Sequence, residues 1–531
     1  MISIDDARAG LGLLWNLPSF MRTPLQPAQA RQILDERLEH REGDFLDLAR
    51  RTIFERQQSP YRPLFTNAGC TYQDLVTLVE REGLDSALRT LCAAGIYLTV
   101  EEFKGRRPIV RGSFSMTADP AQFGNPLIMV HIPTQTSGSR GKRTIAGTSL
   151  AHLRDQAVGL CLFLQARGPA HRVHGHCGVP GGSALHGLLR NYYAGLPLGA
   201  WFSHVDPASP DLHPRYRWSI RIVRLGAALA RRPFPQPRYV RPDDPDPILA
   251  WMVAVRREGL VPHFRSTPST AVLVCQAALA SGIDISGTEF MPGGEPLTPA
   301  RMQVIARAGV KTAALYASVE SGHIGYGCLA PTASDDVHVL SDLQAVIQPG
   351  PSSLDPGLPA DAVLLTSLRP SAPFILLNVS SGDQGRLERR SCGCPVEAVG
   401  WTAHLHTIRS YGKLTTAGMT FLDADLTRVL EEVLPARFGG GPTHYQLVED
   451  EQADGHATLR LLVHPAVVGP LDPDAVADAF FTAIGSTPGA AKVMELFWRD
   501  AGVLRVERQV PLATATGKIQ HLHQHRKTTE R

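Results

Sequence analysis

Residues Thr136–Thr144 read TSGSRGKRT and stand between two segments of different periodicity. The apolar run before them, LIMVHIPT at Leu127–Thr134, has the composition of a strand, and SLAHLRDQAVGLCLFLQARG after them has helical spacing. A strand, a small-residue loop and a helix in this order bring backbone N–H groups toward an anion such as phosphate. The loop is not a P-loop, because its two glycines are too close together and no Gly-Lys-Ser/Thr follows. The stretch predicts an α/β fold with an anion-binding loop, and a plain surface turn is the alternative.

The rest of the chain divides into parts around this loop. The first ~130 residues have mainly helical spacing, and strand-turn-helix units continue to about residue 345. AVLLTSL, PFILLNV and LRLLVHPAVV are further strand candidates. From about Arg409, a helix (LTRVLEEVL), a hairpin, a second helix (PDAVADAFFTAIG) and a last strand predict a small α+β domain. Because 531 residues are too many for one compact core, we expect a large domain followed by a small one.

The composition narrows the class of protein. Hydrophobic residues make up 43% and charged residues 19% of the chain, as in ordinary globular enzymes, and the formal net charge is +3. Lysines and arginines are scattered among acids, so we expect no nucleic-acid partner. No apolar run reaches the ~20 residues of a membrane span, and Asp5 and Asp6 stand where a signal peptide needs basic residues. With only eight cysteines and no need for disulfides, we expect a cytoplasmic protein.

Four further motifs follow the loop in order. They are GGEPLT at 293–298 with LYASVE at 315–320, SGD at 381–383, IRSYGKLTTAG at 408–418 and VPLATATGKI at 510–519. Together with TSGSRGKRT, this series resembles the adenylate-forming superfamily of acyl-CoA synthetases, peptide-synthetase adenylation domains and luciferases. The loop ends in Thr144 where most relatives carry Lys, which is similar to the phenylacetate-CoA ligase branch.

The resemblance implies a two-domain α/β architecture. Residues 1–408 would form a large, multi-sheet N-terminal adenylation domain that binds ATP and the acid, and 409–412 would be a hinge. Residues 413–531 would form a small, mobile α+β domain that carries the catalytic lysine. Tyr411 and Gly412 stand in place of the acidic hinge pair of the family, and a glycine there permits rotation sterically.

The resemblance also implies a role for each motif. Lys518 would contact both the acid and the α-phosphate, where an ammonium neutralises charge as pyrophosphate leaves. Tyr316 would stack on adenine, Asp383 would accept hydrogen bonds from both ribose hydroxyls, and Glu320 would hold Mg²⁺ and take part in catalysis. Further nucleotide contacts would come from Arg409, from the first loop (Thr136, which is also a catalytic candidate, Ser137, Gly138, Ser139, Gly141 and Thr144) and from the second (Gly293, Gly294, Glu295 and Pro296).

Cysteine spacing predicts a metal site. Cys392 and Cys394 form a C-x-C that can share one metal, and Cys328 and His338 can complete a Cys₃His set, a common closed zinc arrangement. The branch of the family is similar at these four positions. Four protein ligands leave no position open for water, so we expect structural zinc. A second stretch, HRVHGHCGVPGG, has spacings that fit no familiar zinc pattern. It falls where the family builds its acid pocket, so His176 is expected to face the substrate.

The activity implied by the resemblance is ATP-dependent adenylation of a small acid, favouring an aromatic carboxylate, with release of pyrophosphate. Transfer to a thiol such as coenzyme A would follow. One alternative passes the activated acid, or an inorganic oxyacid such as nitrite, to an amine. The other is a non-catalytic relative that only binds a nucleotide. The expected ligands are ATP, Mg²⁺, structural Zn²⁺ and coenzyme A, and a homodimer is left open.

Overall fold

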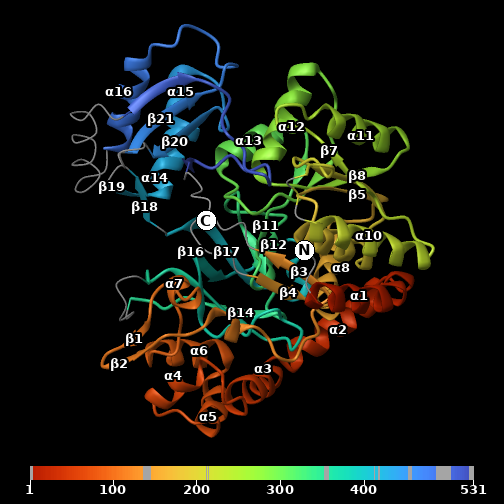
Figure 1. Cartoon of the computed structure of the whole chain (residues 1–531), viewed down its shortest axis with the longest axis vertical. Coiled ribbons are helices and arrows are strands. Elements are labelled where there is room, and N and C mark those ends of the chain that lie inside the picture. Colours follow the sequence, from red (N-terminus) through yellow and green to blue (C-terminus); the bar gives the residue numbers. More distant parts are fainter. Residues whose placement is uncertain are drawn as a thin grey trace.

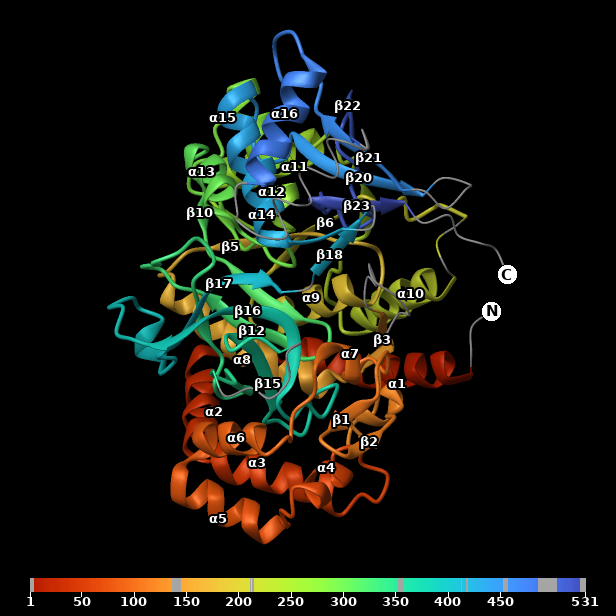
Figure 2. The ribbon, with the colours of Figure 1, turned by 90° about the vertical axis from the view of Figure 1, so that its left-hand side faces the viewer.

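The structure is a computed structural model (Figures 1 and 2). It describes residues 4–135, 145–210, 212, 214–351, 358–411, 413–416, 419–451, 457–485 and 504–525. The loop Thr136–Thr144 and the hinge residue Gly412 lie outside these described residues. Among the described residues, no helix has the length and apolar character needed to cross a membrane.

Helices form the N-terminal part, which confirms the helical spacing of the sequence. Two of them begin at a threonine, Thr71 or Thr99, whose side chain accepts a hydrogen bond from the backbone N–H three residues later, as in a capping box. Helices α3 to α6 lie at one end of the molecule in both views (Figures 1 and 2). The helices are α1 (Ile4–Arg22), α2 (Pro27–Glu39), α3 (Arg41–Ala49) with the π-turn η1 (Arg50–Phe54), α4 (Arg62–Asn67), α5 (Tyr72–Glu82), α6 (Leu84–Ala93) and α7 (Val100–Phe103).

A six-stranded parallel sheet carries the alternating strand-helix units. Its order is β10-β9-β8-β5-β6-β7, and every neighbouring pair is parallel. Parallel neighbours need crossover connections, and the helices between the strands supply them. The strands are β5 (Arg172–Cys177), β6 (Leu198–Ser203), β7 (Pro237–Tyr239), β8 (Val261–Arg265), β9 (Glu289–Phe290) and β10 (Lys311–Thr312). The helices are α8 (Leu150–Ala166), α9 (Gly182–Tyr193), α10 (Pro214–Leu229), α11 (Asp246–Arg257), α12 (Pro268–Ser281) and α13 (Pro299–Arg307).

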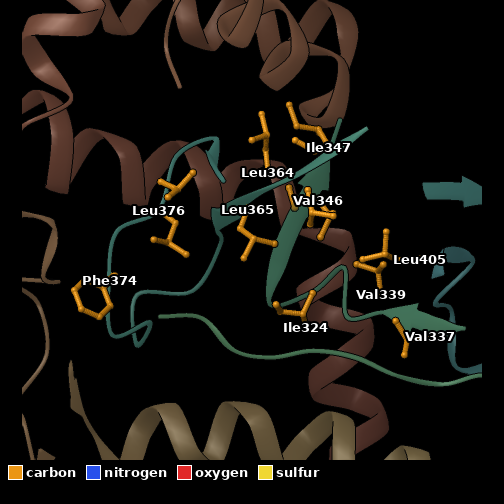
Figure 3. Close-up of a cluster of buried hydrophobic side chains, with 14 of the residues drawn as sticks. Ile324, Val337, Val339, Val346, Ile347, Leu364, Leu365, Phe374, Leu376 and Leu405 are labelled. Carbon is orange, nitrogen blue, oxygen red and sulfur yellow. The ribbon is translucent and has the colours of Figure 1, made fainter. Parts of the chain in front are cut away.

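A seven-stranded antiparallel sheet follows, in the order β11-β12-β13-β17-β16-β15-β14. Aliphatic side chains from these strands meet in a buried cluster, in which Ile324, Val339, Leu365 and Leu405 lie together (Figure 3). This core fixes the strand ends that carry the motifs. The strands are β11 (Leu315–Ser318), β12 (Gly322–Gly327), β13 (Val337–Val339), β14 (Gln344–Ile347), β15 (Ala362–Ser367), β16 (Val379–Arg389) and β17 (Ala403–Ser410).

The C-terminal elements have a sheet and a core of their own. A four-stranded sheet, β22-β21-β20-β23, packs its apolar side chains with those of the helices around Leu430 and Phe480. These elements gather at the end of the molecule opposite α5 (Figures 1 and 2). They are the hairpin β18 (Lys413–Thr416) and β19 (Met419–Leu422), helices α14 (Asp423–Arg428), η4 (Val429–Val433), α15 (Leu434–Phe438) and α16 (Pro473–Ile484), and strands β20 (Tyr445–Glu451), β21 (Ala457–Val463), β22 (Leu504–Arg508) and β23 (Leu522–His525).

Two strand predictions were wrong. Within LIMVHIPT the strand β3 begins only at Ile132 and runs to Gln135, and the described part after the loop is a second strand, β4 (Ile145–Thr148), paired antiparallel with it. PFILLNV is buried, but it forms no strand up to Asn378, and β16 begins only at its last residue, Val379. Its Asn378 has φ +49°, and the side-chain amide donates to the carbonyls of Leu88 and Ile96 at 2.8 and 3.0 Å. This tertiary anchoring overrides the strand composition.

Candidate active site

Lys518 lies in a tight turn just before β23. The N–H of Thr514 donates to the carbonyl of Lys518 at 2.8 Å, and the N–H of Lys518 donates to Thr514 Oγ1 at 3.1 Å. Gly517, between them, has φ +77°, and a Cβ on it would stand 2.4 Å from His204 Cδ2. Glycine is needed at Gly517 for both reasons, which explains the GK pair of the motif.

The turn is docked on the N-terminal part of the chain. The carbonyl of Gly517 accepts a hydrogen bond from Thr267 Oγ1 at 3.3 Å. The N–H of Ile519 donates to Ser269 Oγ at 3.2 Å. Thr267 and Ser269 belong to the start of α12, so the beginning of this helix receives the lysine-bearing turn.

The side chain of Lys518 reaches the turn formed by GGEPLT. Its Nζ lies 3.6 Å from the position that a Cβ on Gly294 would take, and Gly294 has φ +88°. Burial lowers the pKa of Lys518, Glu295 opposes this shift, and the nearby Arg265 adds to it. The ammonium therefore lies buried beside Gly294, between the carboxylate of Glu295 and the guanidinium of Arg265.

The other residues of this turn hold it in position. The N–H of Gly293 donates to Ser266 O at 3.1 Å, and a Cβ on Gly293 would stand 2.4 Å from Leu315 O. The carboxylate of Glu295 accepts from the N–H and the hydroxyl of Ser269, both at 3.0 Å. Pro296 offers its carbonyl to Arg301 Nη1 at 3.4 Å. Glu295 thus anchors the turn to the first residues of α12.

Tyr316 and Asp383, the two residues predicted to bind the nucleoside, are in contact although they lie on different strands of the antiparallel sheet. Tyr316, on β11, donates its hydroxyl to Asp383 Oδ2 at 2.9 Å, and the same hydroxyl lies 3.2 Å from Ser381 Oγ. SGD lies inside β16, where Gly382 has φ +84°. Burial raises the pKa of Tyr316 well above its ordinary value, and the carboxylates of Asp383 and Glu320 add to this effect.

Glu320 and Arg409 flank this pair. Glu320 lies in the turn that joins β11 to β12. Arg409, near the end of β17, donates a hydrogen bond to Asp335 Oδ2 at 2.9 Å. The next residue, Ser410, pairs with Asp383 in the neighbouring strand β16. The structure thus brings Tyr316 and Asp383 together near Glu320, with Arg409 on the strand next to Asp383. The residues of TSGSRGKRT lie outside the described part, and their flanks are β3 and β4.

The predicted metal ligands converge. The donor atoms of Cys328, His338, Cys392 and Cys394 all lie within 4.8 Å of one another. His338 Nε2 is 3.2 Å from Cys394 Sγ and 3.7 Å from Cys392 Sγ, and Cys328 Sγ is 3.9 Å from Cys394 Sγ. Ligand atoms of a tetrahedral zinc site stand about 3.5 to 3.8 Å apart, and the separations within the set lie close to this range.

Surrounding groups orient these ligands. His338 Nδ1 lies 2.6 Å from Trp401 O, which directs Nε2 toward the cysteines. The N–H of Ala330 donates to Cys328 Sγ at 3.4 Å, and Glu397 accepts from the N–H of Cys392 at 2.8 Å. Among the described residues, His174 and His176 belong to no such group.

Sequence reasoning missed a buried ion pair between the two parts of the chain. The carboxylate of Glu431, on η4, accepts a hydrogen bond from Arg301 Nε at 2.8 Å and another from Thr298 Oγ1. Arg301 belongs to α13, and Thr298 is the residue just before this helix. His521 Nε2 lies 2.6 Å from the same carboxylate, and Glu431 and Arg301 are almost fully buried. Thr298 ends the GGEPLT motif, but no motif marks Arg301 or Glu431, which stand 130 positions apart in the sequence.

Two interior arginines were also missed. Arg190 on α9 and Arg265 at the end of β8 lie among the histidines of β5, β8 and β12. The sequence gives a signal for Arg190 alone. This arginine follows two leucines in the largely apolar helix GSALHGLLRNYY, where a charged side chain is unusual.

Comparison with known proteins gives a likeness of fold. A scan of protein-family models and a search of curated proteins found no match to the sequence. Two solved structures of a 2-hydroxyisobutyryl-CoA ligase, both in the postadenylation state, align over 95% of this chain and 91% of theirs. One is in complex with 2-HIB-AMP (16% identity, TM-score 0.56) and the other with R3-HIB-AMP (15% identity, TM-score 0.55). The chain therefore has the fold of the adenylate-forming ligases, with a large N-terminal and a small C-terminal domain.

Proposed function

We propose that this protein is an AMP-forming acid-thiol ligase that adenylates a small carboxylic acid and passes it to coenzyme A. The observation that carries the proposal is the buried Lys518 ammonium, which the turn at Gly517 brings next to Gly294. The meeting of Tyr316 with Asp383 supports it, because an aromatic ring beside a carboxylate suits an adenosine.

In the proposed reaction a carboxylate oxygen of the acid attacks the α-phosphorus of ATP, and the bond from phosphorus to the bridging oxygen of pyrophosphate breaks. The residues have little proton transfer to perform, so positioning and charge neutralisation dominate. Lys518 neutralises charge as the mixed anhydride forms. Asp383 accepts from the ribose hydroxyls, Tyr316 covers the adenine, and Arg409 supports them from the neighbouring strand.

Phosphate contacts come from the TSGSRGKRT loop, with Thr136, Ser137, Gly138, Ser139, Gly141 and Thr144 as the proposed residues. Glu320, beside the nucleoside pair, would supply a carboxylate to Mg²⁺, which would neutralise the phosphates when bound. Zinc in the Cys₃His set would staple the loop after β16 to β12 and β13. With four protein ligands it would have no open position and no part in the chemistry.

The acceptor follows from the fold likeness to a CoA ligase, and one observation favours an amine as a second candidate. Tyr411, at the proposed hinge 409–412, lies 2.6 Å from Ser380 Oγ through its hydroxyl, and its N–H donates to Gly382 O at 3.2 Å. These contacts tie the hinge to β16 and oppose the rotation that a two-step thioester cycle needs.

Pyrophosphate release from ATP, measured over a panel of aliphatic and aromatic acids with and without coenzyme A, tests the proposal. At least one acid should release pyrophosphate without coenzyme A, and adding coenzyme A should yield its thioester. An acyl-AMP that reacts with amines but not with coenzyme A would favour the second candidate. ATP binding without pyrophosphate release for any acid would mean a non-catalytic relative.

A further inference from the structure

Arg190 is buried, and the described residues offer it no counter-charge. It is 6% exposed, its Nη1 donates to Gln156 Oε1 at 3.3 Å, and its Nε has no hydrogen-bond partner among the described residues. The other three buried arginines of the described chain each meet a carboxylate: Arg37 meets Asp155, Arg172 meets Glu289 and Arg301 meets Glu431. A buried guanidinium without an acid is unfavourable unless something else supplies the negative charge.

Arg265, close to Arg190, also has no acidic partner among the described residues. Its Nη1 donates to the backbone carbonyls of Ser266 and Met291 at 2.9 and 3.1 Å. Within the described residues, no carboxylate oxygen lies within 4.0 Å of the nitrogens of Arg190 or Arg265. Burial lowers the pKa of Arg265 to about 9, and the positive charge of Arg190 contributes to this shift.

The histidines around the arginines cannot supply the missing negative charge, and they add no positive charge either. Burial lowers the pKa of His174 to about 3, and it lowers the pKa of His176 and His323 well below the ordinary value, so all three are neutral. His176 Nδ1 and His263 Nε2 have no hydrogen-bond partner among the described residues. The cluster therefore offers both cations and unused polar atoms.

The cluster adjoins the proposed site of reaction. Arg265 contacts the carbonyl of Met291, two residues before the Gly293–Gly294 turn, and its charge lowers the pKa of Lys518. On the other side, Gln156 joins Arg190 to the carbonyl of Ser321, the residue after Glu320. Lys518, Arg265 and Arg190 thus form a line of cations that leads from the reacting centre into the large domain.

We propose that the acid substrate carries a second anionic group, a second carboxylate, which Arg190 binds while Lys518 faces the carboxylate that is adenylated. Arg265 lies between the two ends of the substrate. A guanidinium can donate two parallel hydrogen bonds to a carboxylate, and the neutral histidines add donors and acceptors beside it. This inference rests on the proposed adenylation and specifies its substrate class as dicarboxylic acids.

Matched pairs of acids test it in the wild-type protein. Each pair consists of a dicarboxylic acid and its monoamide, such as succinate with succinamate and terephthalate with its monoamide, because the pair differs in charge but hardly in size. Acid-dependent pyrophosphate release should favour the diacid of the best pair by about 100-fold or more in kcat/KM. Equal or better turnover of the monoamide would overturn the inference and leave the proposed adenylation standing.

Variants of Arg190 sharpen the test. Arg190→Gln should remove the preference for the diacid, measured as the ratio of kcat/KM for diacid and monoamide, and Arg190→Lys should keep part of it. Arg221→Gln, on the exposed face of α10, is the control and should behave as wild type. If Arg190→Gln keeps the full preference, the inference is wrong. If it fails to fold, the wild-type comparison of diacid and monoamide decides, and release with no acid at all would refute the adenylation and this inference together.

Discussion

At the scale of single residues, Gly517 is favoured for two reasons: its φ is positive, and a side chain there would meet His204. Its φ of +77° costs a residue with a side chain about 1 to 2 kcal/mol, and its Cβ would also overlap His204. Gly517→Ala should therefore displace Lys518 and lower the adenylation rate about tenfold or more, with the fold intact by circular dichroism. Gly350→Ala is the matched control, because Gly350 has φ +75° but nothing within 4 Å of its Cβ position. Equal rates in both variants would contradict the docked turn.

Lys518 should also give the reaction an alkaline limit. Burial disfavours the charged ammonium and lowers its pKa, so the active protonated form is lost as pH rises through a value below that of an ordinary lysine. A pH profile of kcat/KM should fall on the alkaline side at that lowered value. Lys518→Arg, whose guanidinium stays charged, should be slower but keep a flat profile there. A wild-type profile that is flat up to the ordinary lysine pKa would speak against this role.

At the scale of elements, the Cys₃His set joins the ends of β12, β13 and β16. Cys394→Ser should abolish the binding of one zinc per chain, measured by mass spectrometry of the metal, and lower the Tm by about 5 °C or more. Cys70→Ser, which changes a cysteine outside the set, should retain both zinc and Tm. Purified wild-type protein that binds no zinc when it is supplied would rule out the staple.

The Arg301–Glu431 pair connects α13 to η4, and so the two parts of the chain. Burial alone would raise the pKa of Glu431, but Arg301 and His521 lower it to about 2. The lowered value means that the pair stabilises the docked arrangement at pH values above the ordinary glutamate pKa, and that this contribution disappears as pH falls toward 2.

Glu431→Gln should weaken this docking at neutral pH by about 3 kcal/mol or more, because Arg301 stays buried without its partner. Small-angle scattering should then show a more open average shape, and adenylation should slow. Glu432→Gln, at the exposed neighbouring position, is the control. Unchanged scattering and rate in Glu431→Gln would show that other contacts hold the two parts together.

The local sequence pattern predicted helices and strands more successfully than it predicted contacts between distant residues. Helices α8 and α16 and the hairpin β20–β21 follow from the spacing of apolar residues, since that spacing decides which face is buried. PFILLNV failed because Asn378 bonds to residues more than 280 positions away, and no local pattern encodes such a partner. For the same reason the motifs located Tyr316 and Asp383, but only the fold reveals their hydrogen bond and the unpaired guanidinium of Arg190.

At the scale of the whole molecule, a two-part architecture carries the proposed chemistry across an interface. The large part supplies Gly293–Gly294, Tyr316 and Asp383, and the small part supplies Lys518. The chain shares its fold with a CoA ligase although the two sequences are only 16% identical. The fold is therefore better preserved than the side chains that would select the acid and the acceptor. The activity must therefore be judged from the site.

The central claim is that this protein forms an acyl-adenylate and that Lys518 promotes the step. ATP–pyrophosphate exchange measures this step alone, in the presence of an acid and without coenzyme A. We expect acid-dependent exchange in the wild type and in Lys311→Ala, an exposed control, and a loss of about 100-fold or more in Lys518→Ala. Exchange that is unchanged in Lys518→Ala, or absent from the wild type with every acid, would contradict the central claim.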